Sequence, residues 1–179
     1  VERSGAAQGL AEIALSLNAS RRLEILTSIT SLQGSSKTAA REGMVWCLSF
    51  FPSVLGEQYA QYISFTLPIV LQGLCDDNDG VREVALRAGQ VMVSVLGSNH
   101  TLELLPGLSE GLFDDDWRIR LCSVSLLGDL LYLVGDTRAA GVADVGDEMG
   151  SSGSSRASQA IRTHIGDECT NDALAALYI

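Results

Sequence analysis

Three consecutive aspartates, Asp114, Asp115 and Asp116, are the residues whose types and spacing most readily suggest chemistry. Adjacent carboxylates can hold a divalent cation or act as an acid/base pair, provided that they converge on one point. Consecutive residues of a turn point in different directions. The two histidines, His100 and His164, are remote in sequence and lack the spacing of a zinc site. We therefore expect no catalytic residue and no metal ligand among them.

A second candidate for chemistry is the stretch LQGSSKT (Leu32–Thr38), which resembles the end of a phosphate-binding loop. No glycine directly precedes Lys37 and no strand-like run leads into the stretch, so we expect no nucleotide and no other cofactor. The enzyme alternative that stays open is a helical protein that uses the aspartate triple. Replacing Asp115 and Asp116 with asparagine would abolish its activity or its metal uptake.

The aspartate triple lies in one copy of an internal repeat. The segment LPIVLQGLCDDNDGVREV (Leu67–Val84) aligns with LPGLSEGLFDDDWRIRLC (Leu105–Cys122). The coincident pairs, all 38 positions apart, are Pro68/Pro106, Gly73/Gly111, Leu74/Leu112, Asp76/Asp114, Asp77/Asp115 and Arg82/Arg120. A weaker echo extends the series toward the N-terminus, because Arg3 and Arg41 are again 38 positions apart and Arg41 and Arg82 are 41 apart. Such a period is close to the two-helix HEAT and armadillo units of about 40–47 residues.

The repeat predicts an all-α fold, a HEAT-repeat α-solenoid of stacked antiparallel helix pairs. Helical spacing of apolar residues predicts second helices near 3–16, 38–55, 80–96 and 116–134, and first helices near 20–33, 58–75 and 99–113. Gly97 and Gly135 stand where two of the second helices should end. Asn18 and Asn99 precede apolar runs and are expected to cap helices.

Composition divides the chain into three parts. Residues 1–135 are expected to form about three and a half helix pairs. Residues 136–156 are rich in glycine, serine and acids and predict a loop or linker. Residues 157–179 predict a short helical pair that continues the solenoid. Because the chain begins with Val1 and ends on an apolar segment, we expect it to be a piece of a longer array.

Four residues are expected to form a structural ladder. In each repeat an aspartate precedes an arginine by six positions, Asp76 before Arg82 and Asp114 before Arg120. The HEAT pattern predicts that their side chains make contacts that recur from one unit to the next. Two further arginines, Arg87 and Arg118, lie outside this pattern, and they either face a partner or form part of a solvated helix face. Trp46 and Trp117 are expected in the core or along a groove.

Charge favours protein partners over nucleic acid. The chain carries 22 acidic and 12 basic residues, a formal net charge of −10, and phosphate binding requires the opposite balance. Its four cysteines, Cys47, Cys75, Cys122 and Cys169, are far apart and predict reduced thiols. No apolar run is long enough to cross a membrane. These features favour a cytosolic or nuclear protein, and the first of these agrees with the cytoplasmic location that we expect.

Longer strings of residues carry a family resemblance. The segments ERSGAAQGLAE (2–12), ALRAGQ (85–90), GLFDDDWRIR (111–120), LLGDLL (126–131) and SQAIRTHIGDECTNDALAALYI (158–179) resemble the general control nonderepressible translational activators. These are very large eukaryotic HEAT-repeat proteins. The likeness runs through the whole chain, whereas the general HEAT pattern specifies only a few of these positions.

The resemblance implies a non-catalytic scaffold. Members of this family associate with translating or collided ribosomes and with translation-control proteins. They recruit and activate the kinase of initiation factor 2α in amino-acid starvation and ribosome stalling. The alternative is an unrelated HEAT-repeat scaffold for protein interaction, of the transport-receptor or phosphatase-subunit type.

Overall fold

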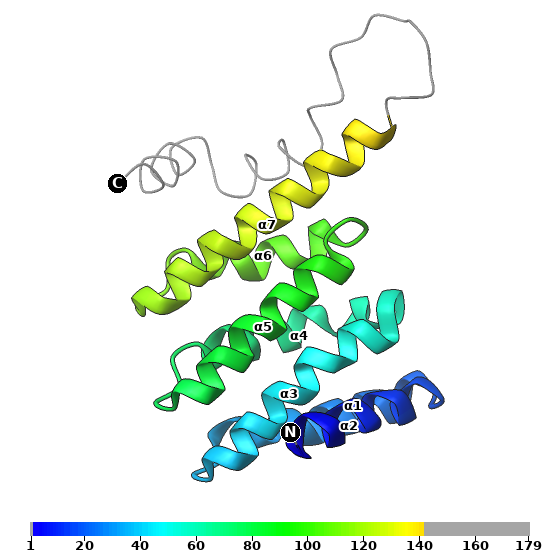
Figure 1. Ribbon diagram of the computed structural model, residues 1–179, viewed down its shortest axis with the longest axis vertical. Helices are drawn as coiled ribbons and strands as arrows, with labels where there is room; N and C mark the ends of the chain where they lie inside the picture. Colours follow the sequence, from blue (N-terminus) through cyan, green and yellow to red (C-terminus); the bar gives the residue numbers. More distant parts are fainter. Residues whose placement is uncertain (1, 142–179) are drawn as a thin grey trace, which may run out of the picture.

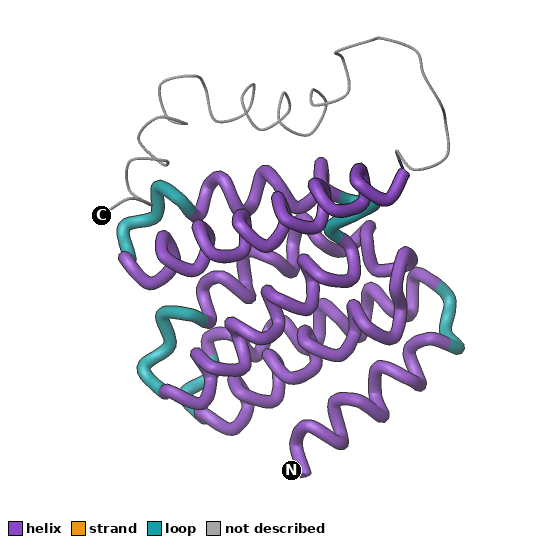
Figure 2. The backbone as a smooth tube through the Cα atoms, turned by 45° about the horizontal axis from the view of Figure 1, so that its top comes forward, coloured by secondary structure: helices purple, strands orange, loops and turns teal. Residues whose placement is uncertain are grey.

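The computed structural model describes residues 2–141, and the side chains of residues 3–134. The described part is built from α-helices and 3-10 helices, without a strand (Figure 2). The elements in chain order are α1 (Glu2–Leu15), α2 (Ala19–Thr30), η1 (Ser31–Gly34), α3 (Thr38–Leu55), η2 (Gly56–Tyr62), α4 (Ile63–Gly73), α5 (Asp79–Leu96), α6 (Thr101–Gly111) and α7 (Trp117–Gly141). The predicted all-α class is confirmed.

The helices form two layers (Figure 1). Helices α1, α3, α5 and α7 stack in order in one layer, and each contacts the next. Helices α2, α4 and α6 lie behind them, and α4 contacts α6. Within a unit α4 packs on α5 and α6 packs on α7. One repeated helix pair therefore adds one step to a solenoid, as the sequence repeat predicts.

The second helix of each unit starts where the repeat places it. Helix α5 is capped by Asn78, whose side-chain oxygen accepts hydrogen bonds from the backbone N–H groups of Gly80 and Val81. It ends at Leu96 with Gly97 as its C-cap, as predicted. The expected end at Gly135 is wrong, because α7 continues to Gly141. A glycine in a helix costs about 1 kcal/mol relative to alanine, which is too little to end a helix by itself.

The predicted helix over 58–75 is only partly correct. Helix α3 ends at Leu55, and its C-cap, Gly56, has a φ of 52°, in the left-handed region that favours glycine. The chain then runs through the 3-10 turns of η2 before α4 begins at Ile63. Tyr59 and Tyr62 of η2 are buried, so these turns are held by packing against the core.

Leucine, valine, alanine and a few aromatic side chains fill the space between the layers. On α5 the buried face includes Val81, Val84, Ala85 and Ala88 and continues through Met92 and Leu96. Val95, which continues the same helical spacing of apolar residues, is 37% exposed instead. A helix has 3.6 residues per turn, so residues spaced by three or four positions do not stay on one line along the helix. Over the 18 residues of α5, the neighbouring helices therefore determine which apolar side chains near its C-terminal end are buried.

Two glycines let the paired helices approach closely. A methyl group on Gly73 would lie 3.0 Å from the Cβ of Ala85, and one on Gly111 would lie 2.2 Å from the Oγ of Ser123. Both glycines and both of their small partners are related by the 38-residue repeat. The repeated glycine thus serves close packing within a unit.

Two of the expected parts lie wholly or mainly outside the described residues. These are the linker over 136–156, apart from the end of α7, and the helical pair over 157–179. Among the described helices, none combines the length and the apolar character needed to span a bilayer.

Candidate functional site

The turns before α3, α5 and α7 each contain the same polar clamp. In α3, α5 and α7 an arginine donates a hydrogen bond to the main-chain carbonyl six residues earlier. The three bonds run from Arg41 to Ser35 (2.7 Å), from Arg82 to Asp76 (2.6 Å) and from Arg120 to Asp114 (2.8 Å). The six-residue spacing in the sequence therefore separates the carbonyl acceptor from the arginine that donates to it. This hydrogen bond joins the loop before each of these helices to the first turn of the helix.

The first residue of each clamp also folds the turn with its side chain. Asp76 Oδ1 accepts from the backbone N–H of Asn78 at 2.9 Å, and Asp114 Oδ1 accepts from that of Asp116 at 2.8 Å. In the earlier unit Ser35 Oγ accepts from the N–H of Lys37 at 3.3 Å. Aspartate and serine are suited to this position because a short side-chain acceptor reaches the amide two residues on.

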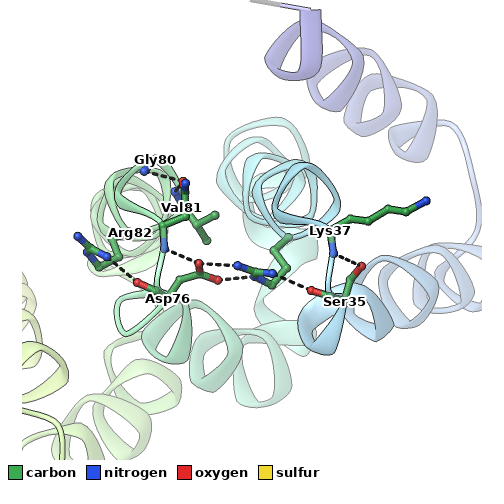
Figure 3. A network of polar contacts seen from close by, with 8 residues as sticks. Ser35, Lys37, Asp76, Gly80, Val81 and Arg82 are labelled. Atoms are coloured by element: carbon green, nitrogen blue, oxygen red, sulfur yellow. Dashed lines mark hydrogen bonds and ion pairs between the residues drawn. The ribbon is translucent and has the colours of Figure 1, made fainter.

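One clamp is joined to its neighbour by an ion pair (Figure 3). Arg41 of α3 contacts both carboxylate oxygens of Asp76, with Nε–Oδ2 at 2.6 Å and a second nitrogen–Oδ1 distance of 2.9 Å. Both side chains are largely buried, with exposures of 17% and 10%. The Arg41 guanidinium holds the pKa of the Asp76 carboxyl below its ordinary value. Consecutive units are therefore linked by a bidentate, charge-assisted pair.

These contacts correct the expected ladder. The structure brings Asp76 close to Arg82, and Asp114 close to Arg120, but the arginines reach carbonyl oxygens and not the carboxylates. The physical reason is that the aspartate carboxylate already serves its own turn, while Arg82 forms its ion pair with Asp79. Two arginines of the series do contact a carboxylate of the next unit: Arg41 pairs with Asp76, and Arg3 pairs with Glu42 at 3.1 Å.

The aspartate triple is used in the same local way. Asp116 Oδ1 accepts from the backbone N–H of Arg118 at 2.7 Å, and the Asp115 carbonyl accepts a second bond from Arg120 at 2.8 Å. Burial, with a contribution from the neighbouring Asp116, raises the pKa of the Cys75 thiol to about 11. No group of three or more histidine, cysteine or acidic side chains in the described region is arranged to hold a metal ion.

A second link between units lies at the opposite ends of α3 and α5, and the sequence did not reveal it. Asn99 donates to Glu57 Oε1 at 2.6 Å, and the His100 ring contacts the other oxygen of that carboxylate. Glu103 approaches the second ring nitrogen of His100 at 3.4 Å. The expected role of Asn99 as a helix cap is wrong, whereas Asn18 does cap α2. No repeated residue marks this contact, so periodicity could not find it.

The two arginines outside the repeat pattern each lie over a tryptophan. Arg87 of α5 lies over the Trp46 ring of α3 at 5.7 Å, and Arg118 lies over the adjacent Trp117 at 5.0 Å. Trp46 is half-buried and lines a groove between α3 and α5, as predicted. Trp117 is 57% exposed and therefore does not lie in the core, which was one of its two expected positions. Helix α7 is the last described helix, and nothing described packs on its outer face.

The arrangement defines a class of protein. Helix pairs stacked in one direction, with repeated turn clamps and polar links between units, form a HEAT-repeat solenoid, whose extended surfaces suit protein binding. The model of the family described as EF3 N-terminal HEAT repeat matches residues 3–144. The chain belongs to this family.

Three curated relatives extend the comparison. The chain is 36% identical over 181 aligned residues to the protein named "Stalled ribosome sensor GCN1" of Homo sapiens, an alignment covering 100% of the chain and 7% of that protein. It is 42% identical over 139 residues to "eIF-2-alpha kinase activator GCN1" of Dictyostelium discoideum, covering 78% and 5%. It is 37% identical over 183 residues to "Protein ILITYHIA" of Arabidopsis thaliana, covering 100% and 7%. The chain thus spans at most 7% of the length of these relatives.

Proposed function

We propose that the chain is a non-catalytic scaffold segment of a ribosome-associated translational activator. In this function it helps to recruit and activate the kinase of initiation factor 2α during amino-acid starvation and ribosome stalling. The observation that carries the proposal is the similarity over the whole chain to proteins named as a stalled ribosome sensor and as eIF-2-alpha kinase activators.

The structure is suited to a scaffold because its polar residues are used to hold the helices together. The turn clamps and the Arg41–Asp76 pair employ the same aspartates and arginines that an acid/base site would need. Their bonds are already made within the turns and between adjacent units, so these groups are not free to converge on a substrate. A binding role would be distributed along the solenoid faces.

The acidic charge favours protein contacts over direct binding to ribosomal RNA. With a formal net charge of −10, the chain would repel phosphate along much of its surface. A cytoplasmic location follows from the proposed association with translating or collided ribosomes. The names of the relatives support this function and give no support to the transport-receptor or phosphatase-scaffold alternative.

Sedimentation of the protein, expressed from its own gene with an epitope tag, tests the proposal. We expect it to sediment with translating ribosomes, and more strongly when ribosomes are stalled by a low dose of an elongation inhibitor. The matched sample is the same lysate after ribosome run-off, where the ribosome-bound fraction should fall. Absence from both translating and stalled ribosomes would contradict the translational function.

A further inference from the structure

A groove lies between α3 and α5, separate from the acidic turns. Its volume is about 520 Å³, and it is lined by Glu42 and Trp46 of α3 and by Glu83, Leu86, Arg87 and Gln90 of α5. We call it the Trp46 groove. It combines an indole and an aliphatic side chain with one exposed arginine, which is the composition of a recognition site for a short protein segment.

Arg87 is held in place without using its hydrogen-bond donors. Glu83 is one helical turn earlier on α5, the usual position for an ion-pair partner, yet no ion pair joins the two. Within the described region Arg87 forms no hydrogen bond or ion pair, and its guanidinium lies over the Trp46 ring. Stacking on an aromatic face leaves the N–H groups at the edge of the guanidinium free for a carboxylate.

Glu42 and Glu83, the two acidic residues of the groove, limit which anions can bind beside Arg87. Glu42 is compensated by Arg3 at 3.1 Å and accepts a hydrogen bond from the Trp46 indole at 3.4 Å. Glu83 is exposed and has no ion-pair partner among the described residues. A polyanion such as RNA would be repelled by Glu83 and by the acidic chain as a whole. A single carboxylate beside apolar side chains would meet Arg87 at short range and would be repelled less than a polyanion, because it carries only one charge.

We propose that the Trp46 groove binds a segment of a partner protein that carries a carboxylate next to apolar side chains. The carboxylate accepts two parallel hydrogen bonds from Arg87, and the neighbouring apolar side chain packs on Trp46 and Leu86. This inference goes beyond the proposed function, because it concerns one docking site and holds whether or not the partner is ribosomal.

Tryptophan fluorescence of the full 179-residue chain tests the proposal. The chain has two tryptophans, so Trp117→Phe leaves Trp46 as the single reporter. The probe is a capped peptide with a single aspartate flanked by leucines, and matched peptides carry asparagine or lysine in place of that aspartate. We expect a saturable change of Trp46 emission with the aspartate peptide. Neither matched peptide should produce one.

Variants in the same background assign the signal to the guanidinium. Arg87→Ala should raise the Kd of the aspartate peptide about tenfold or more, the usual cost of losing hydrogen bonds to a charged group. Arg87→Lys should also weaken binding, because lysine keeps the charge but lacks the planar fork. Arg118→Ala is the matched control and should leave the Kd unchanged. Far-UV circular dichroism should show the same helix content in all variants.

Four outcomes would overturn the proposal. They are no saturable signal with the aspartate peptide, equal binding of the lysine peptide, and an unchanged Kd in Arg87→Ala. The fourth is an Arg87-dependent signal of similar strength from a short oligouridine, which would assign the groove to RNA.

Discussion

Arginine at the fourth position of α3, α5 and α7 has two separable roles. In all three helices it bonds to the carbonyl six residues back, which closes the turn. Only Arg41 also pairs with an aspartate of the next unit. Helical side chains point back toward the N-terminus, so a guanidinium at this position naturally meets the preceding turn. The link between units also needs a carboxylate in the turn of the next unit within reach of the guanidinium, as Asp76 is for Arg41.

The two roles predict different costs of truncation. Arg41→Ala should lower the melting temperature more than Arg82→Ala, because it leaves the Asp76 carboxylate, 10% exposed, without its partner. Arg87→Ala, which removes an exposed side chain, should cost least. Thermal unfolding followed by circular dichroism gives the order. The control is the double variant, in which Asp76→Asn should recover part of the melting temperature lost in Arg41→Ala. Equal decreases of the melting temperature in Arg41→Ala and Arg82→Ala would contradict the assignment of the inter-unit link to Arg41.

Alanine substitutions at Gly111 and Gly128 should change the free energy of unfolding in opposite directions, because only Gly111 is closely packed. Gly111→Ala should destabilise by about 1–3 kcal/mol, as overpacking usually does, because its Cβ would lie 2.2 Å from Ser123 Oγ. Gly128→Ala on α7 meets no atom within 4 Å. It should stabilise by about 0.5–1 kcal/mol through helix propensity. Chemical denaturation measures both.

Ser123 provides the check on this explanation. Its Oγ is buried without a hydrogen-bond partner, so Ser123→Ala should be tolerated and should relieve part of the Gly111→Ala penalty. Additive effects of the two substitutions would argue against a direct clash.

At the scale of elements, consecutive units are held together at both ends of their second helices. One end has the Arg41–Asp76 pair, and the other has the contact of Glu57 with Asn99 and His100. The hydrogen bond to Glu57 is the main cause that raises the pKa of His100 above its ordinary 6.5, with Glu103 adding to it. Hydrogen bonds from Asn99 and His100 lower the pKa of Glu57 below its ordinary 4.5.

These opposite shifts predict a pH window for this contact. The contribution of His100 is complete below its unfolded pKa and is lost as the pH rises through its higher folded pKa. The contribution of Glu57 is present above its unfolded pKa and is lost as the pH falls through its lower folded pKa. The contact should therefore stabilise most between pH 4.5 and pH 6.5.

Melting temperatures of the native chain and Glu57→Gln test the window. We expect a larger difference between the two at about pH 5.5 than at about pH 9, because the contribution of His100 is lost as the pH rises through its folded pKa. Glu24→Gln removes an exposed carboxylate paired with Arg21 within α2 and serves as the control. A difference that is the same at both pH values would contradict the role of His100.

At the scale of the molecule, each unit contacts mainly its neighbours along the stack. Helices α3 and α5 have neighbours on both sides, and the contact between them is the most extensive of the described part. The outer face of α7 exposes Trp117, Leu121 and Tyr132. In such an array stability is a sum of units and of the interfaces between them, so it varies along the chain.

Native-state hydrogen exchange should show this gradient. Amides in the middle of α3 and α5 should be the best protected, with opening free energies about 2 kcal/mol or more above those of α1 and α7. Mass spectrometry of peptides from each helix provides the measurement. Uniform protection from α1 to α7 would mean that the chain unfolds as one cooperative unit and would refute the additive description.

The sequence predicted the helices better than the contacts between them. The 38-residue repeat placed the starts of α5 and α7 correctly, because caps, turn residues and apolar spacing act over a few neighbouring positions. The predicted helix end at Gly135 was wrong, because α7 continues through this residue. The predicted helix over 58–75 was wrong at its start, because buried Tyr59 and Tyr62 lie in the 3-10 turns of η2. The sequence identified Asp76 and Arg82 as a contacting pair, but it did not show that Arg82 bonds to the main-chain carbonyl of Asp76. Spacing alone does not distinguish that carbonyl from the side-chain carboxylate.

By itself, the sequence determined the all-α class, the length of the repeat and the positions of the turns, since these follow from local propensity and period. Only the tertiary structure decided that Arg41 pairs with Asp76, that Glu57 meets Asn99 and His100, and that Arg87 lies over Trp46. Each of these contacts joins residues about one repeat apart. Their partners are chosen by how one unit rotates and shifts on the next, which depends on the packing of whole helix faces.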